Sequence, residues 1–157
     1  MQEPRLWFLP VDPSQGSEPS SQFLDPEDRP LQNKRVVIVE DEGITHLQLR
    51  KICLQEGMVV AGSATNGARA VQLVKETVPD LVLMDIQMPV MNGLDATEKI
   101  LSEMRMCIIM LTAYNDDEYR ARALLAGASG YVLKPVTSTT LIPEASEAYR
   151  RFLSRPV

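Results

Sequence analysis

Five short apolar runs are spaced along the chain from residue 35 onward, and longer stretches of mixed polarity separate them. The runs are rich in branched residues and hold few charges, which is typical of strands buried on both faces of a sheet. We therefore predict five strands, at residues 35–39, 58–64, 81–84, 106–111 and 130–133.

The stretches between these runs have helical periodicity. Residues 43–56 place Leu49, Ile52 and Cys53 on one face, and Gly57 suits the position that follows a helix C-terminus. His46, the only histidine, is expected on a solvated face of this helix. Four further helices are predicted, at residues 67–78, 93–104, 116–126 and 139–153.

The starts of the last two helices are set by polar residues. Asn115 or Asp116 suits the N-cap of the fourth helix. We expect Thr139 or Thr140 to begin the fifth, because Pro143 is then in the first turn, where a missing N–H is tolerated.

Strands that alternate with helices favour a parallel sheet covered on both faces. Right-handed crossovers and a flavodoxin-like, doubly wound arrangement give the strand order 2-1-3-4-5. The predicted fold is therefore α/β, with five parallel strands and five helices. In this order the first and third strands are neighbours.

Polar side chains follow four of the apolar runs. Glu40 and Asp41 end the first run, Asp85 the third, Thr112 the fourth and Lys134 the fifth. The carboxyl ends of parallel strands lie at one edge of a sheet, where ligands collect. Carboxylates, a hydroxyl and an ammonium group in one place suit a divalent cation and a phosphoryl group.

Four motifs resemble those of the receiver domains of two-component response regulators, and they occur in the family's order over residues 34–153. The motifs are Glu40-Asp41, Asp85-x-x-Met88-Pro89-x-Met91-x-Gly93, Thr112-Ala113 and Tyr131-x-x-Lys134-Pro135. The resemblance implies a CheY-like phosphoacceptor domain. It also implies a cis peptide bond before Pro135.

The resemblance assigns a role to each site residue. Asp85 is the phosphoacceptor, and Mg²⁺ (or Mn²⁺) is held by Asp41, Asp85 and the backbone carbonyl of Gln87, with Glu40 acting through water. Lys134 and Thr112 contact the phosphoryl group, and Thr112 and Tyr131 form the switch. The expected metal residues are therefore Glu40, Asp41, Asp85 and Gln87. The residues expected to take part in phosphoryl transfer are Asp85, Thr112 and Lys134, and those expected to form the switch are Thr112 and Tyr131.

The implied function is a signalling switch rather than an enzyme, with self-catalysed phosphoryl transfer and autodephosphorylation as its only chemistry. The phosphoryl donor is a histidine kinase or a phosphotransfer protein. Phosphorylation is expected to change the binding of a downstream protein, or homodimerisation, through the surface formed by the fourth helix, fifth strand and fifth helix.

Three alternatives compete with this interpretation. One is a pseudo-receiver that binds partners without phosphorylation. Another is the receiver part of an antitermination-type regulator whose RNA-binding part is missing, which the last helix resembles. The third is a hydrolase of the haloacid dehalogenase type, but such enzymes need a second Asp two positions after the nucleophile, where this chain has Gln87.

Residues 1–33 differ from the rest of the chain in composition. They hold six of the eleven prolines, four serines, six acids and two bases, which leaves residues 34–157 with a net charge of about −1 out of −5. Such a composition predicts a disordered tail before a receiver domain at 34–157. Its one apolar cluster, Leu6-Trp7-Phe8-Leu9, is either a short docking motif or incidental hydrophobicity.

The remaining features favour a cytoplasmic protein. The near-neutral domain gives no reason to expect binding to DNA, RNA or a membrane surface, and no apolar run is long enough to span a bilayer. Cys53 and Cys107 fall in a predicted helix and a predicted strand, so we expect two buried thiols.

Overall fold

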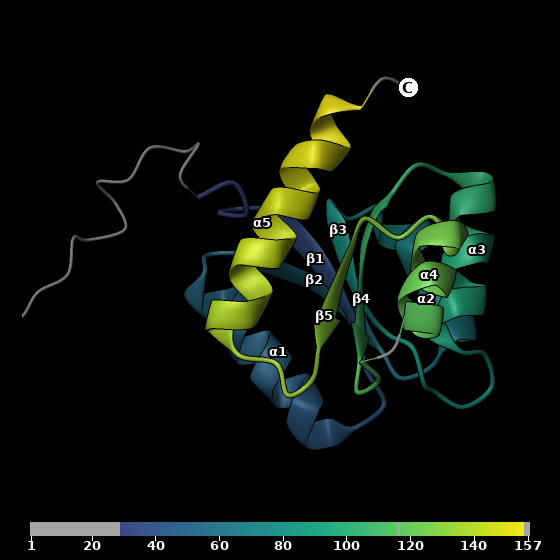
Figure 1. Cartoon of the computed structure of the whole chain (residues 1–157). Helices are drawn as coiled ribbons and strands as arrows, with labels where there is room; N and C mark the ends of the chain where they lie inside the picture. The colour runs from purple at the N-terminus through teal and green to yellow at the C-terminus, as the bar shows by residue number, and fades with distance from the viewer. Residues whose placement is uncertain (1–28, 116, 156–157) are drawn as a thin grey trace, which may run out of the picture.

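Ten elements alternate along the chain in the computed structural model, which describes residues 29–115 and 117–155 (Figure 1). They are β1 Arg35–Val39, α1 Gly43–Gln55, β2 Val59–Ala64, α2 Gly67–Thr77, β3 Leu81–Asp85, α3 Gly93–Glu103, β4 Cys107–Thr112, α4 Asp117–Ala126, β5 Gly130–Leu133 and α5 Ser138–Ser154. All strand pairs are parallel, in the order β2-β1-β3-β4-β5. The predicted flavodoxin-like α/β fold is confirmed.

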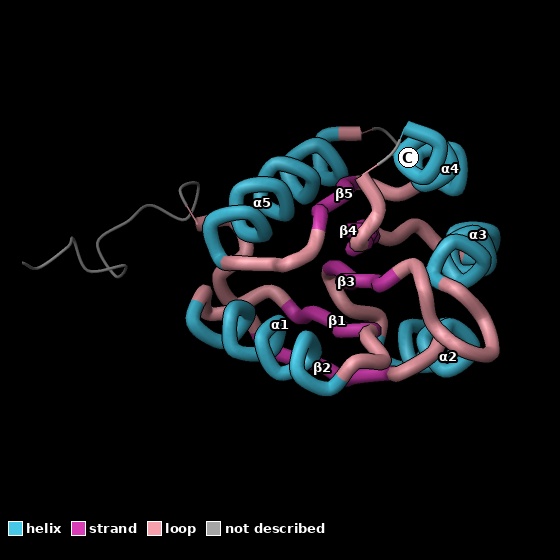
Figure 2. Tube along the Cα trace, turned by 60° about the horizontal axis from the view of Figure 1, so that its bottom comes forward, coloured by secondary structure: helices cyan, strands magenta, loops and turns pink. Residues whose placement is uncertain are grey.

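The helices cover both faces of the sheet. Figure 2 shows α1 and α5 on one face and α2, α3 and α4 on the other. Because side chains alternate along a strand, Val36 and Ile38 of β1 pack toward α1 and α5, whereas Val37 and Val39 pack toward α2 and α3. β3 and β4 are buried on both faces, which explains their uninterrupted apolar sequences.

Local signals set most of the helix ends. Gly57 has a φ of +89° just after α1, as its sequence position predicted, and Asn66 caps α2 by accepting a hydrogen bond from the N–H of Arg69 at 2.8 Å. Cys53 and Cys107 are both buried, as predicted. Within the described part of the chain, no helix is long and apolar enough to cross a membrane.

The start of α5 was predicted incorrectly. Thr137 is its N-cap, and Thr137 and Thr140 form a reciprocal capping box: the side-chain oxygen of each accepts from the backbone N–H of the other, at 3.0 and 3.3 Å. The helix therefore begins at Ser138, and Pro143 lies inside it, beyond the first turn. The capping box thus marks the first residue of α5, and Pro143 is accommodated inside the helix.

The folded unit begins earlier than the predicted boundary at residue 34. Leu31 is 0% exposed and belongs to the core beneath α1 and α5. The guanidinium of Arg29 donates to the carbonyl oxygen of Glu56 at 2.7 Å and pairs with the Glu56 carboxylate at 3.6 Å. Residues 1–28 of the predicted tail, which include its apolar cluster, lie outside the described residues, as does the candidate N-cap Asp116.

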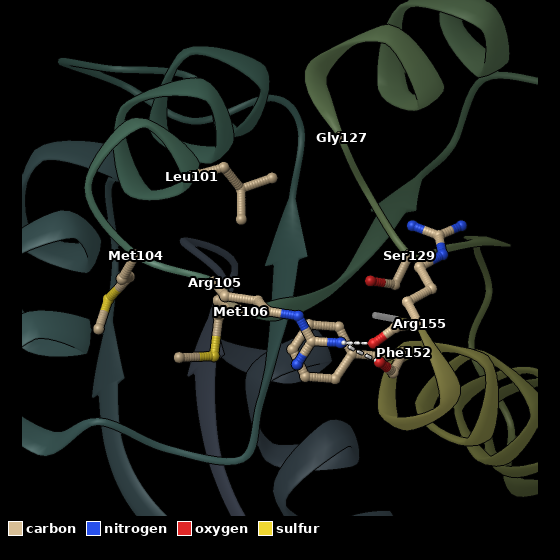
Figure 3. A pocket seen from close by; sticks show the side chains of 8 residues that line it. All are labelled: Leu101, Met104, Arg105, Met106, Gly127, Ser129, Phe152 and Arg155. Atoms are coloured by element: carbon tan, nitrogen blue, oxygen red, sulfur yellow. Dashed lines mark hydrogen bonds between the residues drawn. The ribbon is translucent and has the colours of Figure 1, made fainter. Parts of the chain in front are cut away.

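A cavity of about 330 Å³ lies between the C-terminal ends of α3, α4 and α5 (Figure 3). One of its polar groups is the guanidinium of Arg105, which stacks on the Phe152 ring at 4.0 Å. The same guanidinium donates to the carbonyl oxygens of Phe152 and Arg155, the latter at 3.2 Å. These contacts satisfy carbonyls that end α5, so Arg105 has a structural role here.

Candidate functional site

Three carboxylates meet where β1 and β3 end. The two strands are adjacent and parallel, with Val39 opposite Met84. Glu40 and Asp41 follow β1, and Asp85 is the last residue of β3, so one oxygen from each of the three lies within 4.8 Å of the others. The chain leaves β1 and β3 toward opposite faces of the sheet (Figure 2), which makes this edge the topological switch point.

A cavity of about 210 Å³ lies at this edge. It is lined by Glu40, Asp41, Glu42, Asp85, Gln87, Thr112, Ala113, Tyr114 and Lys134. Six of the seven residues predicted to form the site therefore line one cavity. The seventh, Tyr131, does not line it.

The position of Asp85 depends on a close approach of α3. The backbone N–H of Gly93 donates to the carbonyl oxygen of Ile86 at 2.7 Å. A Cβ atom at residue 93 would lie 2.0 Å from the carbonyl oxygen of Asp85, a distance that no side chain allows. The spacing from Asp85 to Gly93 in the motif thus has a steric reason, since only glycine lets the first turn of α3 reach the end of β3.

Lys134 forms ion pairs with both buried carboxylates. Its Nζ lies 2.8 Å from Oε1 of Glu40 and 3.2 Å from Oδ1 of Asp85. Glu40 is 1% exposed and Asp85 is 4% exposed. The peptide bond between Lys134 and Pro135 is cis, as predicted. One ammonium group is therefore shared by two carboxylates that have little access to water.

One ammonium group does not neutralise this site. Burial, followed by the negative charge of Glu40, raises the pKa of Asp85 to about 7, although Lys134 opposes both effects. Oε1 of Glu40 is buried and makes no well-aligned hydrogen bond within residues 29–115 and 117–155, despite its short distance to Lys134. The pocket therefore has more negative charge and more acceptor capacity than the described side chains satisfy.

These properties fit a hard divalent cation. The three acids offer oxygen ligands only, and the exposed side chain of Asp41 leaves one side open to water. Mg²⁺ binds through few carboxylates and keeps several waters. A cation would also remove the repulsion that raises the pKa of Asp85.

Thr112 is linked to Tyr131 through the backbone of Tyr114. The Thr112 hydroxyl, 1% exposed, accepts a hydrogen bond from the N–H of Tyr114 at 3.0 Å. The carbonyl oxygen of Tyr114 accepts from the Tyr131 hydroxyl at 2.7 Å. Movement of Thr112 would therefore move the backbone that holds Tyr131.

Sequence reasoning missed two features near the site. Tyr119 stacks on Tyr114, with ring centroids 4.9 Å apart, and the Arg120 guanidinium lies 4.6 Å from the centre of the Tyr131 ring. Each contact joins α4 to a different segment, the loop after β4 or strand β5, so no periodicity within one element predicts it. His46 is half-buried beside an open hollow, and its Nδ1 is buried without a hydrogen bond to any residue that the structure describes.

Comparison with known proteins identifies the family. The response regulator receiver domain matches residues 36–146. The chain belongs to this family. Receiver domains are phosphoaccepting signalling switches of two-component systems rather than enzymes, and they bind Mg²⁺ through acidic residues such as those that cluster here.

Two relatives illustrate the range of the family. The transcriptional regulatory protein PdtaR of Mycobacterium tuberculosis is 39% identical over 119 residues, which cover 76% of this chain and 58% of PdtaR. The chemotaxis protein CheY of Thermotoga maritima is 39% identical over 110 residues, which cover 69% of this chain and 92% of CheY. The chain thus spans little more than half of PdtaR.

Solved structures agree with the fold. A LuxR-family response regulator from Aurantimonas sp. SI85-9A1 has a TM-score of 0.72 and 28% identity, and the match covers 76% of this chain and 87% of that one. The CheX–CheY–BeF₃–Mg complex of Borrelia burgdorferi has a TM-score of 0.65 and 29% identity, with 68% and 81% covered.

Proposed function

We propose that this receiver domain accepts a phosphoryl group on Asp85 from a histidine kinase or a phosphotransfer protein, in a reaction that depends on Mg²⁺. The observation that supports this most strongly is the position of Asp85. It ends β3 in a cavity lined by two more carboxylates, a lysine and a threonine hydroxyl. These groups are the ones needed to form an acyl phosphate: a carboxylate nucleophile, carboxylates that can hold a cation, and donors for the phosphoryl oxygens.

The transfer requires ionised Asp85. A carboxylate oxygen of Asp85 forms the new bond to phosphorus while the bond from phosphorus to the donor nitrogen breaks and its electron pair leaves with the donor imidazole. Bound Mg²⁺ would neutralise charge on the phosphoryl oxygens. Asp41, Asp85 and the backbone carbonyl of Gln87 would hold it, with Glu40 acting through water.

Lys134 and Thr112 complete the proposed site. Lys134 already contacts Asp85, and a small movement of its long side chain would bring Nζ to a phosphoryl oxygen. The Thr112 hydroxyl accepts from the N–H of Tyr114, which leaves its own proton free to donate to another phosphoryl oxygen. Both contacts would stabilise the negative charge of the phosphoryl oxygens, which is absent before the phosphoryl group binds.

Mg²⁺ is expected to stabilise the native protein but not Asp41→Ala. At a Mg²⁺ concentration tenfold above its dissociation constant, binding adds about 1.4 kcal/mol to the free energy of unfolding. For a chain of this size that raises the melting temperature by about 3–6 °C. Thermal denaturation with and without Mg²⁺ measures this, and Glu98→Ala, which removes an exposed carboxylate from α3, is the control. An equal response in Asp41→Ala would place the metal elsewhere.

The proposed signal passes from Thr112 to Tyr131. When Thr112 moves to donate to the phosphoryl group, it pulls on the Tyr114 backbone to which the Tyr131 hydroxyl is bonded. Tyr131 then changes position on β5. Leu124 and Leu125 are 64% and 87% exposed on the adjacent helix α4, and they supply apolar surface for a downstream protein or a second copy.

Thr112→Ala is expected to accept phosphate yet lose this response. Hydrogen exchange of amides 112–135 is measured with and without beryllofluoride, a phosphate mimic. The native protein and the surface control Thr139→Ala should show several-fold changes, and Thr112→Ala should show none. A normal response in Thr112→Ala would refute the route.

A second candidate is the receiver part of a longer transcriptional regulator. The match to PdtaR favours it, because the chain aligns with only 58% of that protein. The intact mass of the protein isolated from its native source distinguishes a single-domain regulator from a longer one. A mass of 17.5 kDa supports a single-domain regulator, whereas a larger mass with this sequence inside it supports the longer one.

A further inference from the structure

The outer face of α1 has an apolar ridge that no other described element covers. Ile44, Leu47 and Leu54 are 71%, 65% and 51% exposed, and their spacing places them along one side of the helix. Two hollows border the ridge and share Leu47. The larger, of about 500 Å³, is lined by Glu40, Asp41, Gly43, Ile44, His46, Leu47, Ser63 and Thr65. The smaller, of about 370 Å³, is lined by Leu47, Arg50, Lys51, Leu54 and Gln55.

The ridge has a positive border at the smaller hollow, whereas the larger hollow includes Glu40 and Asp41. Arg50 and Lys51 are exposed, and the sequence of α1 contains no acidic residue. His46, which lines the larger hollow, is also polar, and its Nδ1 is buried without a hydrogen bond among the described residues. An occupant of this surface should therefore combine large apolar side chains, a polar group and negative charge.

The amino-terminal segment of this chain has that composition. Leu6-Trp7-Phe8-Leu9 supplies four large apolar side chains and one indole N–H. Residues 10–28 then hold five acids and no base: Asp12, Glu18, Asp25, Glu27 and Asp28. We propose that residues 6–9 dock on the ridge of α1, with the following acids against Arg50 and Lys51.

The chain is long enough for this contact. Arg29 is fixed to Glu56, just beyond the C-terminal end of α1. Twenty residues lead back from Arg29 to Leu9 and span up to about 70 Å when extended, whereas the 13 residues of α1 span about 20 Å. A tether of this length holds its end at an effective concentration of about 1 mM, so even a weak contact is well populated.

The larger hollow also includes Glu40 and Asp41, which line the cavity around Asp85. A docked segment would therefore lie at the rim of the phosphoacceptor cavity. The contact itself uses neither Asp85 nor bound metal. Its test is consequently independent of whether the chain accepts phosphate.

Trp7 is the only tryptophan, so its fluorescence reports this contact in the full chain. In the native protein we expect blue-shifted emission and an acrylamide quenching constant several-fold lower than in the urea-denatured chain. Leu47→Glu should bring both quantities close to their denatured values. Leu125→Glu, which changes an 87% exposed leucine on α4, is the matched control and should leave them unchanged. Far-ultraviolet circular dichroism verifies that both variants are folded.

Three outcomes would overturn the proposal. In the first, acrylamide quenches Trp7 of the native protein as readily as in urea. In the second, Trp7 is protected equally in Leu47→Glu, which would place Trp7 on another surface. Protection that disappears on dilution would show that residues 6–9 dock on a second copy. A loss of protection in the double variant Arg50→Glu/Lys51→Glu, at constant protein concentration, would support the charged part of the contact.

Discussion

Asp85→Asn is expected to raise the free energy of unfolding of the metal-free protein by roughly 2–4 kcal/mol at pH 8. The folded-state pKa of Asp85 is about 7, against 3.8 for an ordinary aspartate. Between these values the native state holds a proton that the unfolded state has released. The stability of the native protein therefore falls as pH rises from about 4 to about 7, and it stays reduced above pH 7. Asparagine cannot ionise, so the variant escapes this loss.

Urea denaturation at pH 4.5 and at pH 8 measures the effect. The stability difference between Asp85→Asn and the native protein should be small at pH 4.5 and large at pH 8. Saturating Mg²⁺ should narrow it at pH 8, because a cation compensates the charge of ionised Asp85 in the native protein. A difference that does not change with pH would show that Asp85 is ionised at pH 4.5 and that its environment is different.

Gly93→Ala is expected to destabilise the protein by about 3 kcal/mol or more. A Cβ atom would lie 2.0 Å from the carbonyl oxygen of Asp85. That oxygen belongs to the backbone at the end of a buried strand, so it cannot move away as a flexible side chain would. Either α3 shifts outward or the end of β3 is distorted, and both changes displace Asp85.

Gly43→Ala is the matched control. Gly43 is the first residue of α1, as Gly93 is of α3, but nothing lies within 4 Å of a Cβ atom at residue 43. Alanine there should be neutral or stabilising by up to about 1 kcal/mol. Chemical denaturation of both variants measures the difference. Equal effects at the two positions would contradict the steric argument.

The sequence predicted the fold and the meeting of the site residues because both depend on strand order. Once β1 and β3 are neighbours, residues that follow their apolar runs must share an edge. The order itself came from doubly wound connectivity and from the four motifs. Gly93 was recognised as part of a motif, but its contact with the Asp85 carbonyl is a matter of three-dimensional packing.

The sequence could not predict contacts between a loop or turn and another element, because loops and turns have no hydrophobic periodicity that shows which side chains face inward. The link from Thr112 through the Tyr114 backbone to Tyr131 joins a loop to a strand. Leu31 was assigned to a polar tail by composition, yet one leucine in a turn is enough to fill a space beside α1. The start of α5 was predicted too late, because the preference of proline for the first turn of a helix was considered without the capping box formed by Thr137 and Thr140.

The central claim is that Asp85 is the phosphoacceptor. Its most direct test is intact-protein mass spectrometry of the full chain after incubation with acetyl phosphate and Mg²⁺, followed by peptide mapping. We predict the addition of one phosphate that is labile to hydroxylamine, maps to Asp85 and is absent in Asp85→Asn and without Mg²⁺. Labelling of Asp85→Asn to the native level, or no labelling of a native protein that binds Mg²⁺, would contradict the account.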